Sequence, residues 1–394
     1  MSYSDSLTLS SLEKDPDPIL AELRKHEPVC FVPALEMWFI TKWEDVAFME
    51  SHPEIFSAAT NPSFLARALG PNMLTMDRPE SSKARNVMLP AFQAGGVAGN
   101  FVSTDLTELV DRTIDQFIEK GKVEIMRDFA TPVSASALAI VLGLDSHSWE
   151  EVWEWCEGLC SDIANFENDP ELTNKGNVAR DSLGKVLTKS LEKLTKRPNE
   201  TALSAFIHSK GGESALSQEE IVNNVRLMIS GGINEPRDGI GLVVKTVLED
   251  PELREELLSN ELLWRKCVEE VFRLHSPVGT ITRQTKSEVK IRDKIIPANS
   301  LVSGILRSAN RDEDHWSNPD SFDLHRKEGP HAAFALGEHR CLGEWLGRQV
   351  VKTASQRLFT RIEEFELKSN SEIKLRGFEF RGPLELNCVW GKRV

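Results

Sequence analysis

Apolar residues recur at every third or fourth position along most of the chain, and this spacing predicts a mainly helical protein. The longest such stretch, residues 217–249, opens with a capping box at Ser217–Glu220 (SQEE) and stops at Asp250–Pro251, so we expect one long helix there. The same spacing predicts shorter helices at residues 15–27, 41–52, 101–144 (two helices), 146–191 (broken near Asn168–Pro170), 251–259, 260–275 and 342–358.

Strand patterns are short and lie mainly near the two ends of the chain. Residues 29–42 alternate loosely between apolar and polar side chains, which predicts a small hairpin. Weak periodicity with proline and glycine predicts a long loop at residues 57–76, and Gly211–Gly212 predicts a turn. Further short strands are predicted at residues 280–285, 287–291, 294–300 and within 373–390. The predicted fold class is mainly α with minor β.

Composition limits the classes of protein and partner that fit this pattern. The 394 residues contain no Pro/Gly/Ser-rich linker, so we expect a single domain over residues 1–394. The net charge of −14 comes without a basic tract, which argues against nucleic acid as a partner. A polar N-terminus and the absence of any apolar run of ~18 residues predict no membrane span. Six cysteines without a CxxC pair favour a reducing environment, so we expect a cytoplasmic protein.

One segment, residues 331–343 (HAAFALGEHRCLG), combines a cysteine with glycines and cationic side chains. Cys341 precedes the predicted helix 342–358, so we expect the free N–H groups and the dipole of the helix end to stabilise a thiolate. Gly337 would permit a turn with positive φ, and Gly343 would let the helix approach a flat partner closely. A lone cysteine is more often a small buried apolar residue, but this setting favours a ligand.

The spacing of Phe334, Gly337, Cys341 and Gly343 forms FxxGxxxCxG, which resembles the haem-ligand signature of the cytochrome P450 family. The resemblance implies a P450-like fold with a long central helix over the haem and small β-sheets. It also implies that the Cys341 thiolate binds the iron of haem b (heme b, iron protoporphyrin IX).

A second matching motif is ExxR, formed by Glu270 and Arg273 on one face of a predicted helix. Most such pairs are solvated surface charges, but this one precedes a Ser-Pro break at the position of the family's ExxR. The resemblance implies a buried charge network that supports the cysteine loop, with Arg326 as its third member.

Haem also carries two propionates, which need cations or strong hydrogen-bond donors. The resemblance assigns these contacts to His339, Arg283 and Arg85. The family often has a histidine four residues before the arginine that corresponds to Arg85, and here that position is Ser81. Substrate contacts can be carried over only as regions, which are the 61–75 loop and residues 229–233, 278–281 and 378–380.

The centre of the long helix departs from the family pattern. The family usually carries [AG]-G-x-[DE]-T there, an acid and a threonine that relay protons to dioxygen. If Gly231 and Gly232 fill the glycine positions, Asn234 takes the acid position and Glu235 takes the threonine position. In the other register Glu235 is the acid and Pro236 replaces the threonine, which loses one glycine match. We prefer the first register.

This departure still allows proton transfer. Pro236 has no N–H, so the carbonyl of Gly232 loses its helical partner, a kink is predicted, and the freed carbonyl can hold oxygen or an ordered water. In a dry pocket the pKa of Glu235 would rise toward neutrality, which suits a general acid. Alternatively, Glu235 points away from the pocket and binds backbone. Asp238 and Arg237 either connect it to solvent or pair with each other.

The resemblance implies a haem-thiolate monooxygenase that inserts one oxygen atom of O2 into a small organic substrate, by hydroxylation or by oxidative O-demethylation of a methyl ether. Since no flavin or ferredoxin module is visible, electrons would come from a ferredoxin and a ferredoxin reductase, or from a flavodoxin-type donor. Arg340 and Lys83 are expected among the basic residues near the cysteine face. Two alternatives stay open: a hydrogen-peroxide-dependent peroxygenase, and a non-catalytic haem-binding sensor or carrier.

Overall fold

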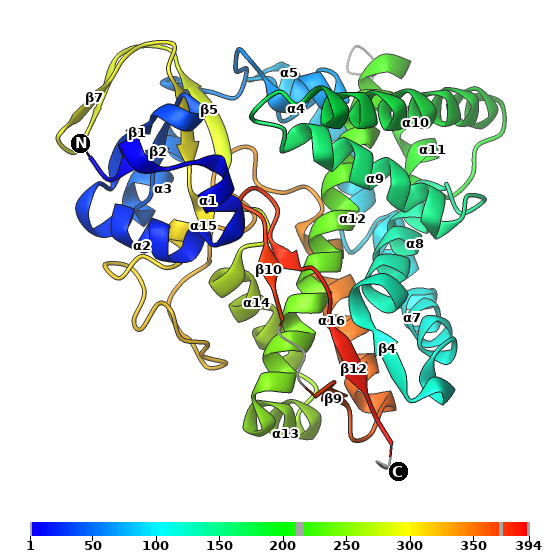
Figure 1. Ribbon diagram of the computed structural model, residues 1–394. Helices are drawn as coiled ribbons and strands as arrows, with labels where there is room; N and C mark the ends of the chain where they lie inside the picture. The colour runs from blue at the N-terminus through cyan, green and yellow to red at the C-terminus, as the bar shows by residue number, and fades with distance from the viewer. Residues whose placement is uncertain (1, 210–215, 370–372, 392–394) are drawn as a thin grey trace.

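The computed structural model describes residues 2–209, 216–369 and 373–391, and the long helix α12 (Gln218–Glu249) runs through its middle (Figure 1). The predicted capping box is confirmed: the Ser217 hydroxyl accepts from the Glu220 N–H at 3.1 Å, and the Glu220 carboxylate accepts from the Ser217 N–H at 2.7 Å. The helix passes through Pro236 without interruption. The turn predicted at Gly211–Gly212 lies outside the described residues.

Other helices pack around α12 and cover its apolar faces (Figure 1). Helix α8 (Thr131–Leu142) is buried along almost its whole length, as expected for a helix that is apolar on all sides. The remaining helices are α1 (Leu9–Lys14), α2 (Pro16–His26), α3 (Trp43–Ser51), α4 (Phe64–Leu69), α5 (Glu80–Phe92), α6 (Val97–Thr104), α7 (Leu106–Asp115), α9 (Trp149–Ile163), α10 (Pro170–Lys196), α11 (Ala202–Ile207), α13 (Pro251–Ser259), α14 (Leu263–His275), α15 (Leu306–Ala309) and α16 (Glu344–Arg361).

Two helix predictions need correction. The predicted long loop at residues 57–76 contains α4, whose first turn is capped by the Ser63 hydroxyl. The two helices predicted for residues 101–144 are α7 and α8, and between them lies a strand, β4 (Lys122–Glu124). This strand is only three residues long and pairs with β12 (Asn387–Val389) near the end of the chain, so a local pattern could not reveal it.

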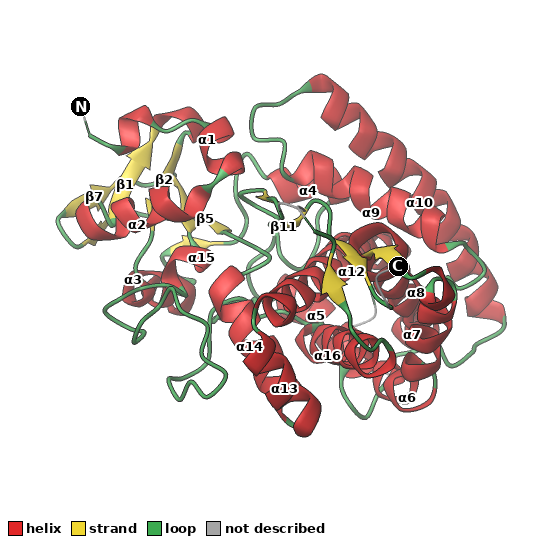
Figure 2. Cartoon of the chain, turned by 60° about the horizontal axis from the view of Figure 1, so that its bottom comes forward, coloured by secondary structure: helices red, strands yellow, loops and turns green. Residues whose placement is uncertain are grey.

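The largest sheet in the described residues has five strands and lies beside the N-terminal helices, apart from the helices around α12 (Figure 2). The predicted hairpin is confirmed as the antiparallel pair β1–β2, with Val29 opposite Ile40. The order of this sheet is β1-β2-β8-β5-β3, with bounds β1 (Val29–Val32), β2 (Met37–Ile40), β8 (Leu301–Gly304), β5 (Ile281–Thr285) and β3 (Phe56–Ser57). The other strands are β6 (Val289–Ile291), β7 (Lys294–Ile296), β9 (Glu366–Leu367), β10 (Leu375–Arg376) and β11 (Gly382–Pro383).

The turn between β10 and β11 is joined to the segment that leads into β5. Val278 and Phe380 form an antiparallel bridge, and the Gly279 N–H donates to the carbonyl of Glu379 at 2.8 Å. These bonds bring two regions together that are about 100 residues apart in the chain, and both face the same cavity.

Candidate active site

The loop that carries Cys341 is held by backbone bonds. The Cys341 N–H donates to the carbonyl of Phe334 at 2.8 Å, and the Arg340 N–H donates to the carbonyl of Gly337 at 3.0 Å. The positive φ expected at Gly337 occurs instead at Ala335, where φ is 61°. Gly337 is required for another reason, because a Cβ there would lie 2.2 Å from the carbonyl oxygen of Glu50.

Cys341 is the one exposed cysteine among the six, all of which lie in the described residues. Its exposed surface faces a cavity within the fold, while its burial away from bulk solvent raises the thiol pKa to about 11. Helix α16 begins three residues later, at Glu344, with Gly343 as its N-cap, and the Gly343 N–H is the backbone donor that lowers this pKa. This N–H stabilises the thiolate, as expected from the helix end, but burial outweighs it in the metal-free protein, and a bound metal ion would deprotonate the thiol.

The cavity has room for a flat ligand between Cys341 and α12. Its volume is about 330 Å³. A Cβ added at Gly343 would meet no protein atom within 4 Å, and one added at Gly347 would come only within 4.0 Å of Pro236. On the facing helix, a Cβ at Gly231 would meet only the Glu235 carboxylate, at 3.9 Å. Glycines thus border an open gap on both sides, which fits a haem ring.

The three predicted propionate ligands meet at this cavity. Arg85 of α5, Arg283 of β5 and His339 of the cysteine loop all line it. Arg283 is held by an ion pair with Glu50 at 2.9 Å, whereas Arg85 forms no hydrogen bond or ion pair with the described part of the chain. Burial and the charges of both arginines lower the pKa of His339 to about 4, so it is neutral at pH 7. Two cations and a neutral donor at one edge fit the carboxylates of haem.

The predicted charge network behind the cysteine loop is confirmed. The Arg273 guanidinium donates to both oxygens of Glu270 at 2.8 Å, and Arg326 donates to Glu270 at 2.9 Å. The side chains of Arg273 and Glu270 are 1% and 5% exposed. Arg273 also donates to the carbonyl of Asn310, and the Asn310 side chain accepts from the Ala332 N–H at 2.7 Å. The network thereby reaches the first residues of the cysteine loop.

Phe334 links the cysteine loop to Arg348 of helix α16. Its ring lines the cavity, and the Arg348 guanidinium lies 4.1 Å from the ring centroid. Arg348 is itself held by Glu269 at 2.6 Å and by Glu344 at 2.8 Å. This arrangement fixes the loop from the side opposite the gap.

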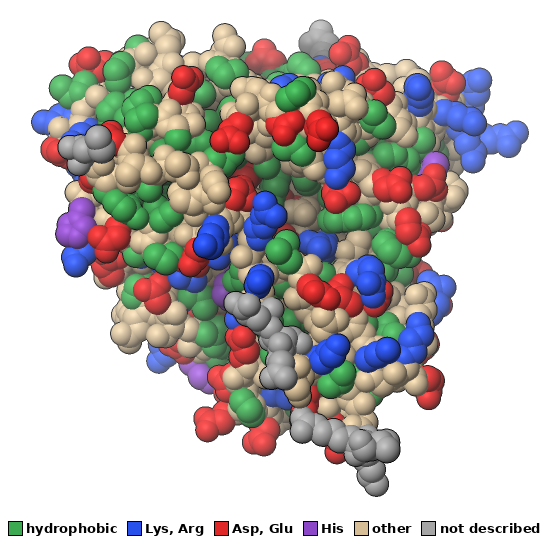
Figure 3. All heavy atoms as spheres, in the orientation of Figure 1, with side chains coloured by type: hydrophobic (Ala, Val, Ile, Leu, Met, Phe, Trp, Pro, Cys, Tyr) green, Lys and Arg blue, Asp and Glu red, His purple; other side chains and the backbone are tan. Residues whose placement is uncertain are grey.

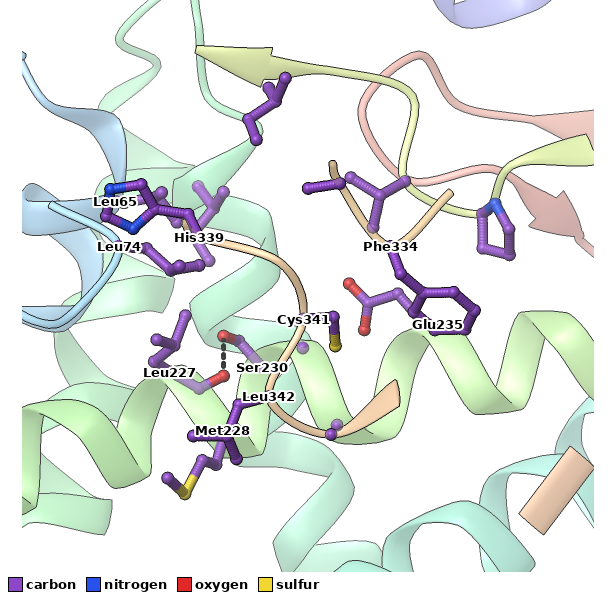
Figure 4. A pocket seen from close by; sticks show the side chains of 18 of the residues that line it. Leu65, Leu74, Leu227, Met228, Ser230, Glu235, Phe334, His339, Cys341 and Leu342 are labelled. Carbon is purple, nitrogen blue, oxygen red and sulfur yellow. Dashed lines mark hydrogen bonds between the residues drawn. The ribbon is translucent and has the colours of Figure 1, made fainter. Parts of the chain in front are cut away.

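On the other side of the gap, α12 presents Gly231, Gly232, Glu235 and Pro236 to the cavity. Figure 4 shows the side chains of Glu235 and Cys341 projecting into this space. Burial raises the pKa of Glu235 to about 8, and one of its carboxylate oxygens has no hydrogen-bond partner in the described structure. The alternative in which Glu235 points away from the pocket is therefore wrong.

The other polar residues of this helix lie elsewhere. Asn234 is buried, does not line the cavity, and its amide nitrogen has no hydrogen-bond partner in the described residues. Asp238 and Arg237 pair with each other at 2.6 Å, which decides between the two arrangements left open for them. Next to the kink expected at Pro236, the carbonyl of Ile233 accepts from the Ser134 hydroxyl of α8 at 2.6 Å.

Two carboxylates near the cavity were missed from the sequence. Glu50 has no motif around it and is revealed only by its contact with Arg283. Glu379 lies in the predicted wall region 378–380, and it faces the cavity and accepts a short hydrogen bond from Thr280. Burial raises the pKa of Glu379 to about 7. The sequence contains one signal for this residue, because an acidic side chain between Phe378 and Phe380 is unusual in a predicted cavity wall.

The basic surface expected near the cysteine is largely neutralised. Lys83 pairs with Glu220 at the start of α12 (3.1 Å), and the exposed Arg340 pairs with Glu344 (2.8 Å). On the face shown in Figure 3, acidic and basic side chains are mixed, and Lys and Arg side chains gather at the end of α10, where Lys193 and Lys196 are exposed. The basic cluster of this face therefore lies on α10.

Comparison with known proteins agrees with this geometry. The family model for cytochrome P450 matches residues 164–376, more than half of the chain. Pulcherriminic acid synthase of Bacillus subtilis (strain 168) is 24% identical, with 97% of this chain and 96% of that protein covered. The biotin biosynthesis cytochrome P450 of the same strain is 26% identical, with 98% and 99% covered. The crystal structure of P450BioI in complex with hexadec-9Z-enoic acid ligated acyl carrier protein is 25% identical, covers 97% of this chain and 100% of that chain, and has a TM-score of 0.88.

A cysteine facing a flat gap, with donors for two carboxylates at its edge, defines a haem-thiolate protein. The chain belongs to the cytochrome P450 family, is of the bacterial type, and departs from the family pattern at its oxygen-activating helix. It is a monooxygenase with haem b as its cofactor, and this class uses O2 and redox partners. The alternative of a non-catalytic sensor or carrier is thereby set aside. Among the described helices, none has the length and apolar composition to cross a membrane.

Proposed function

We propose that this enzyme oxidises a small, largely apolar organic molecule, either by hydroxylation at carbon or by oxidative O-demethylation of a methyl ether. The observation that carries the proposal is that the Cys341 thiol and the Glu235 carboxyl group line one mainly apolar cavity. O-demethylation is proposed only from the unusual sequence Gly231–Pro236, and hydroxylation is equally compatible with it.

Each contact to the cofactor is assigned to a residue of this chain. Cys341 would bind the iron, while Arg85, Arg283 and His339 would hold the propionates. Phe334 packs against Arg348, and Gly337 packs against the backbone of Glu50, so both residues hold the loop in place. Gly343 leaves the gap open for the ring. When bound, haem supplies the redox chemistry that activates O2.

Glu235 is proposed as the proton donor in place of the family's threonine. Because burial raises its pKa to about 8, the carboxyl group is mostly protonated at pH 7 and can release a proton into the cavity. The carbonyl of Gly232 has no partner on Pro236 and is proposed to hold an ordered water next to this carboxyl group. Asn234 is proposed to assist from behind the helix, through the amide nitrogen that has no partner in the described residues.

We infer that residues 1–394 act as one domain and receive electrons from separate proteins, a ferredoxin with its reductase or a flavodoxin-type donor. Arg340 is an exposed cation in the loop beside Cys341 and would contact such a donor. An acidic donor would have to compete with Glu344 for this arginine, because the two are paired.

A hydrogen-peroxide-dependent reaction is the second candidate. Glu235 supports it, because one of its carboxyl oxygens has no hydrogen-bond partner in the described residues and, in the ionised fraction, could accept a proton from peroxide bound nearby. In this case product would form from peroxide without a reductant.

The test begins with the purified haem-loaded enzyme. The reduced carbon-monoxide complex should show the red-shifted Soret band of a thiolate ligand, and Cys341→Ser should lose that band. Candidate methyl ethers, terpenes and fatty acids are then screened for a substrate-induced spin shift. Binders are incubated with O2, NADPH, ferredoxin and reductase, or with peroxide alone. Substrate-dependent NADPH oxidation with product supports the main proposal, product from peroxide alone supports the second, and a normal Soret band in Cys341→Ser would refute both.

A further inference from the structure

The cavity contains a second carboxyl group that neither haem binding nor proton delivery uses. Glu379 lies in the turn between β10 and β11 and lines the cavity together with Thr280. Its carboxylate accepts a hydrogen bond from the Thr280 hydroxyl, which fixes the direction of the Glu379 side chain. A buried carboxyl group in a mainly apolar cavity costs free energy, so its position calls for a function.

The turn that carries Glu379 is rigidly attached. The Gly279 N–H donates to the carbonyl of Glu379, and the Arg381 N–H donates to the carbonyl of Pro277 at 2.9 Å. Gly377 has a φ of 112° and a Cβ there would lie 1.7 Å from the carbonyl oxygen of Phe380, so this position requires glycine. The Glu379 carboxyl group is therefore presented at a fixed point of the cavity wall.

The charges around the cavity are distributed unevenly. Among the described lining residues, the acids are Glu235 and Glu379, and the cationic or imidazole side chains are Arg85, Arg283 and His339. The latter three form the propionate site proposed above. The remaining part of the cavity would then hold two carboxyl groups. They are close enough to interact electrostatically, since the charge of Glu379 raises the pKa of Glu235.

A buried arginine, Arg307, acts on Glu379 through its charge but does not occupy the cavity that the Glu379 carboxyl group faces. Arg307 is 2% exposed, donates to the carbonyl of Ser276 at 2.8 Å, and does not line the cavity. No ion pair joins it to Glu379 within the described residues. Arg307 helps the carboxyl group to ionise, and a cation in the cavity would complete the pairing.

We propose that Glu379, supported by Thr280, binds a protonated amine of the substrate. This inference rests on the proposed monooxygenase function and names the substrate class: an apolar molecule that carries a basic nitrogen away from the position that is oxidised. The ammonium group donates to the free side of the Glu379 carboxylate, while the apolar remainder packs against side chains such as Phe64, Leu65 and Phe380.

The test uses three probes with one alkyl chain and different head groups: N,N-dimethyldodecylamine, dodecan-1-ol and dodecanoate. Dissociation constants are measured on the haem-loaded enzyme by spin-shift titration and by calorimetry, at pH 7. The wild-type enzyme should bind the amine at least about 10-fold more tightly than the alcohol and should bind dodecanoate most weakly. The order of the three probes requires no variant, so it tests the proposal even if a variant fails to fold.

Glu379→Gln keeps an acceptor for Thr280 but removes the charge. We expect it to reduce the preference for the amine over the alcohol to within about 3-fold, with binding of the alcohol unchanged and binding of dodecanoate improved. Glu385→Gln, an exposed carboxylate in the same segment and outside the cavity, removes the same charge and should leave all three constants unchanged.

An equal preference in wild type and Glu379→Gln would overturn the proposal, and so would amine binding that gives the spectrum of a nitrogen–iron bond. Failure of the amine to bind would also overturn it, provided that the carbon-monoxide complex shows the thiolate band. Absence of that band would instead refute the proposed function, so the two failures are distinguishable.

Discussion

Replacement of Glu235 by glutamine tests the state of this carboxyl group in the folded protein. Burial raises its pKa from an ordinary value of 4.5 to about 8. The folded chain therefore keeps a proton that the unfolded chain releases between these two values, and the free energy of unfolding falls as the pH rises through this window. Glutamine has nearly the same shape and cannot ionise, so this loss should be absent in the variant.

The size of the effect follows from the two pKa values. Each pKa unit corresponds to about 1.36 kcal/mol, so the variant should be more stable than the wild type by about 1 kcal/mol at about pH 5.5, about 3 kcal/mol at about pH 7 and between about 4 and 5 kcal/mol at about pH 8.5. These values are upper limits, because a neutral amide still has to be accommodated in the cavity. The difference between variant and wild type should thus grow by about 3 kcal/mol over this range of pH.

The assay is urea unfolding followed by circular dichroism at several pH values, with haem removed from both proteins. Glu255→Gln, which changes an exposed acid of α13, is the control and should give a difference that does not vary with pH. A Glu235→Gln difference that is constant between about pH 5.5 and 8.5 would refute the raised pKa. It would also remove the basis for proton delivery by Glu235.

The glycines and charges around Cys341 give further tests. Gly337→Ala should destabilise the apoprotein by about 1–3 kcal/mol, because its Cβ would meet the Glu50 carbonyl, whereas Gly343→Ala should leave apoprotein stability unchanged and weaken haem retention in a transfer assay to apomyoglobin. Glu270→Ala leaves two buried guanidinium groups without their carboxylate and should lower the free energy of unfolding by about 3–5 kcal/mol, as measured by urea unfolding. Arg85→Ala should accelerate haem loss without changing apoprotein unfolding, and equal haem loss in variant and wild type would contradict its assignment.

Sequence reasoning succeeded where the information is local or follows a fixed motif. The capping box at Ser217 depends on residues three apart, and the Glu270–Arg273 pair lies on one helix face, so both could be predicted from spacing. The motif around Cys341 located the cavity for the same reason. The role of Gly337 was misjudged, because its neighbour Glu50 is nearly 300 residues away in the chain.

Other features depended on contacts between distant segments. Strand β4 forms only against β12, and the direction of the Glu379 side chain is set by Thr280. The raised pKa of Cys341 could not be read from the sequence either, because burial outweighs the single N–H from Gly343, and the depth of a cavity is a property of the whole fold. Sequence spacing identifies which side chains can meet, but it does not measure how far they lie from solvent.

The turn between β10 and β11 has a consequence for engineering. Main-chain bonds from Gly279 and to Pro277 hold it in place, Gly377 gives it its shape, and the buried ring of Phe378 stacks on Phe39, whereas the side chains of Glu379 and Phe380 face the cavity. Libraries that randomise Glu379 and Phe380 while keeping these anchors should therefore retain the fold and the iron ligand. Substrate scope could then be redesigned at this one wall while the rest of the catalyst stays as it is.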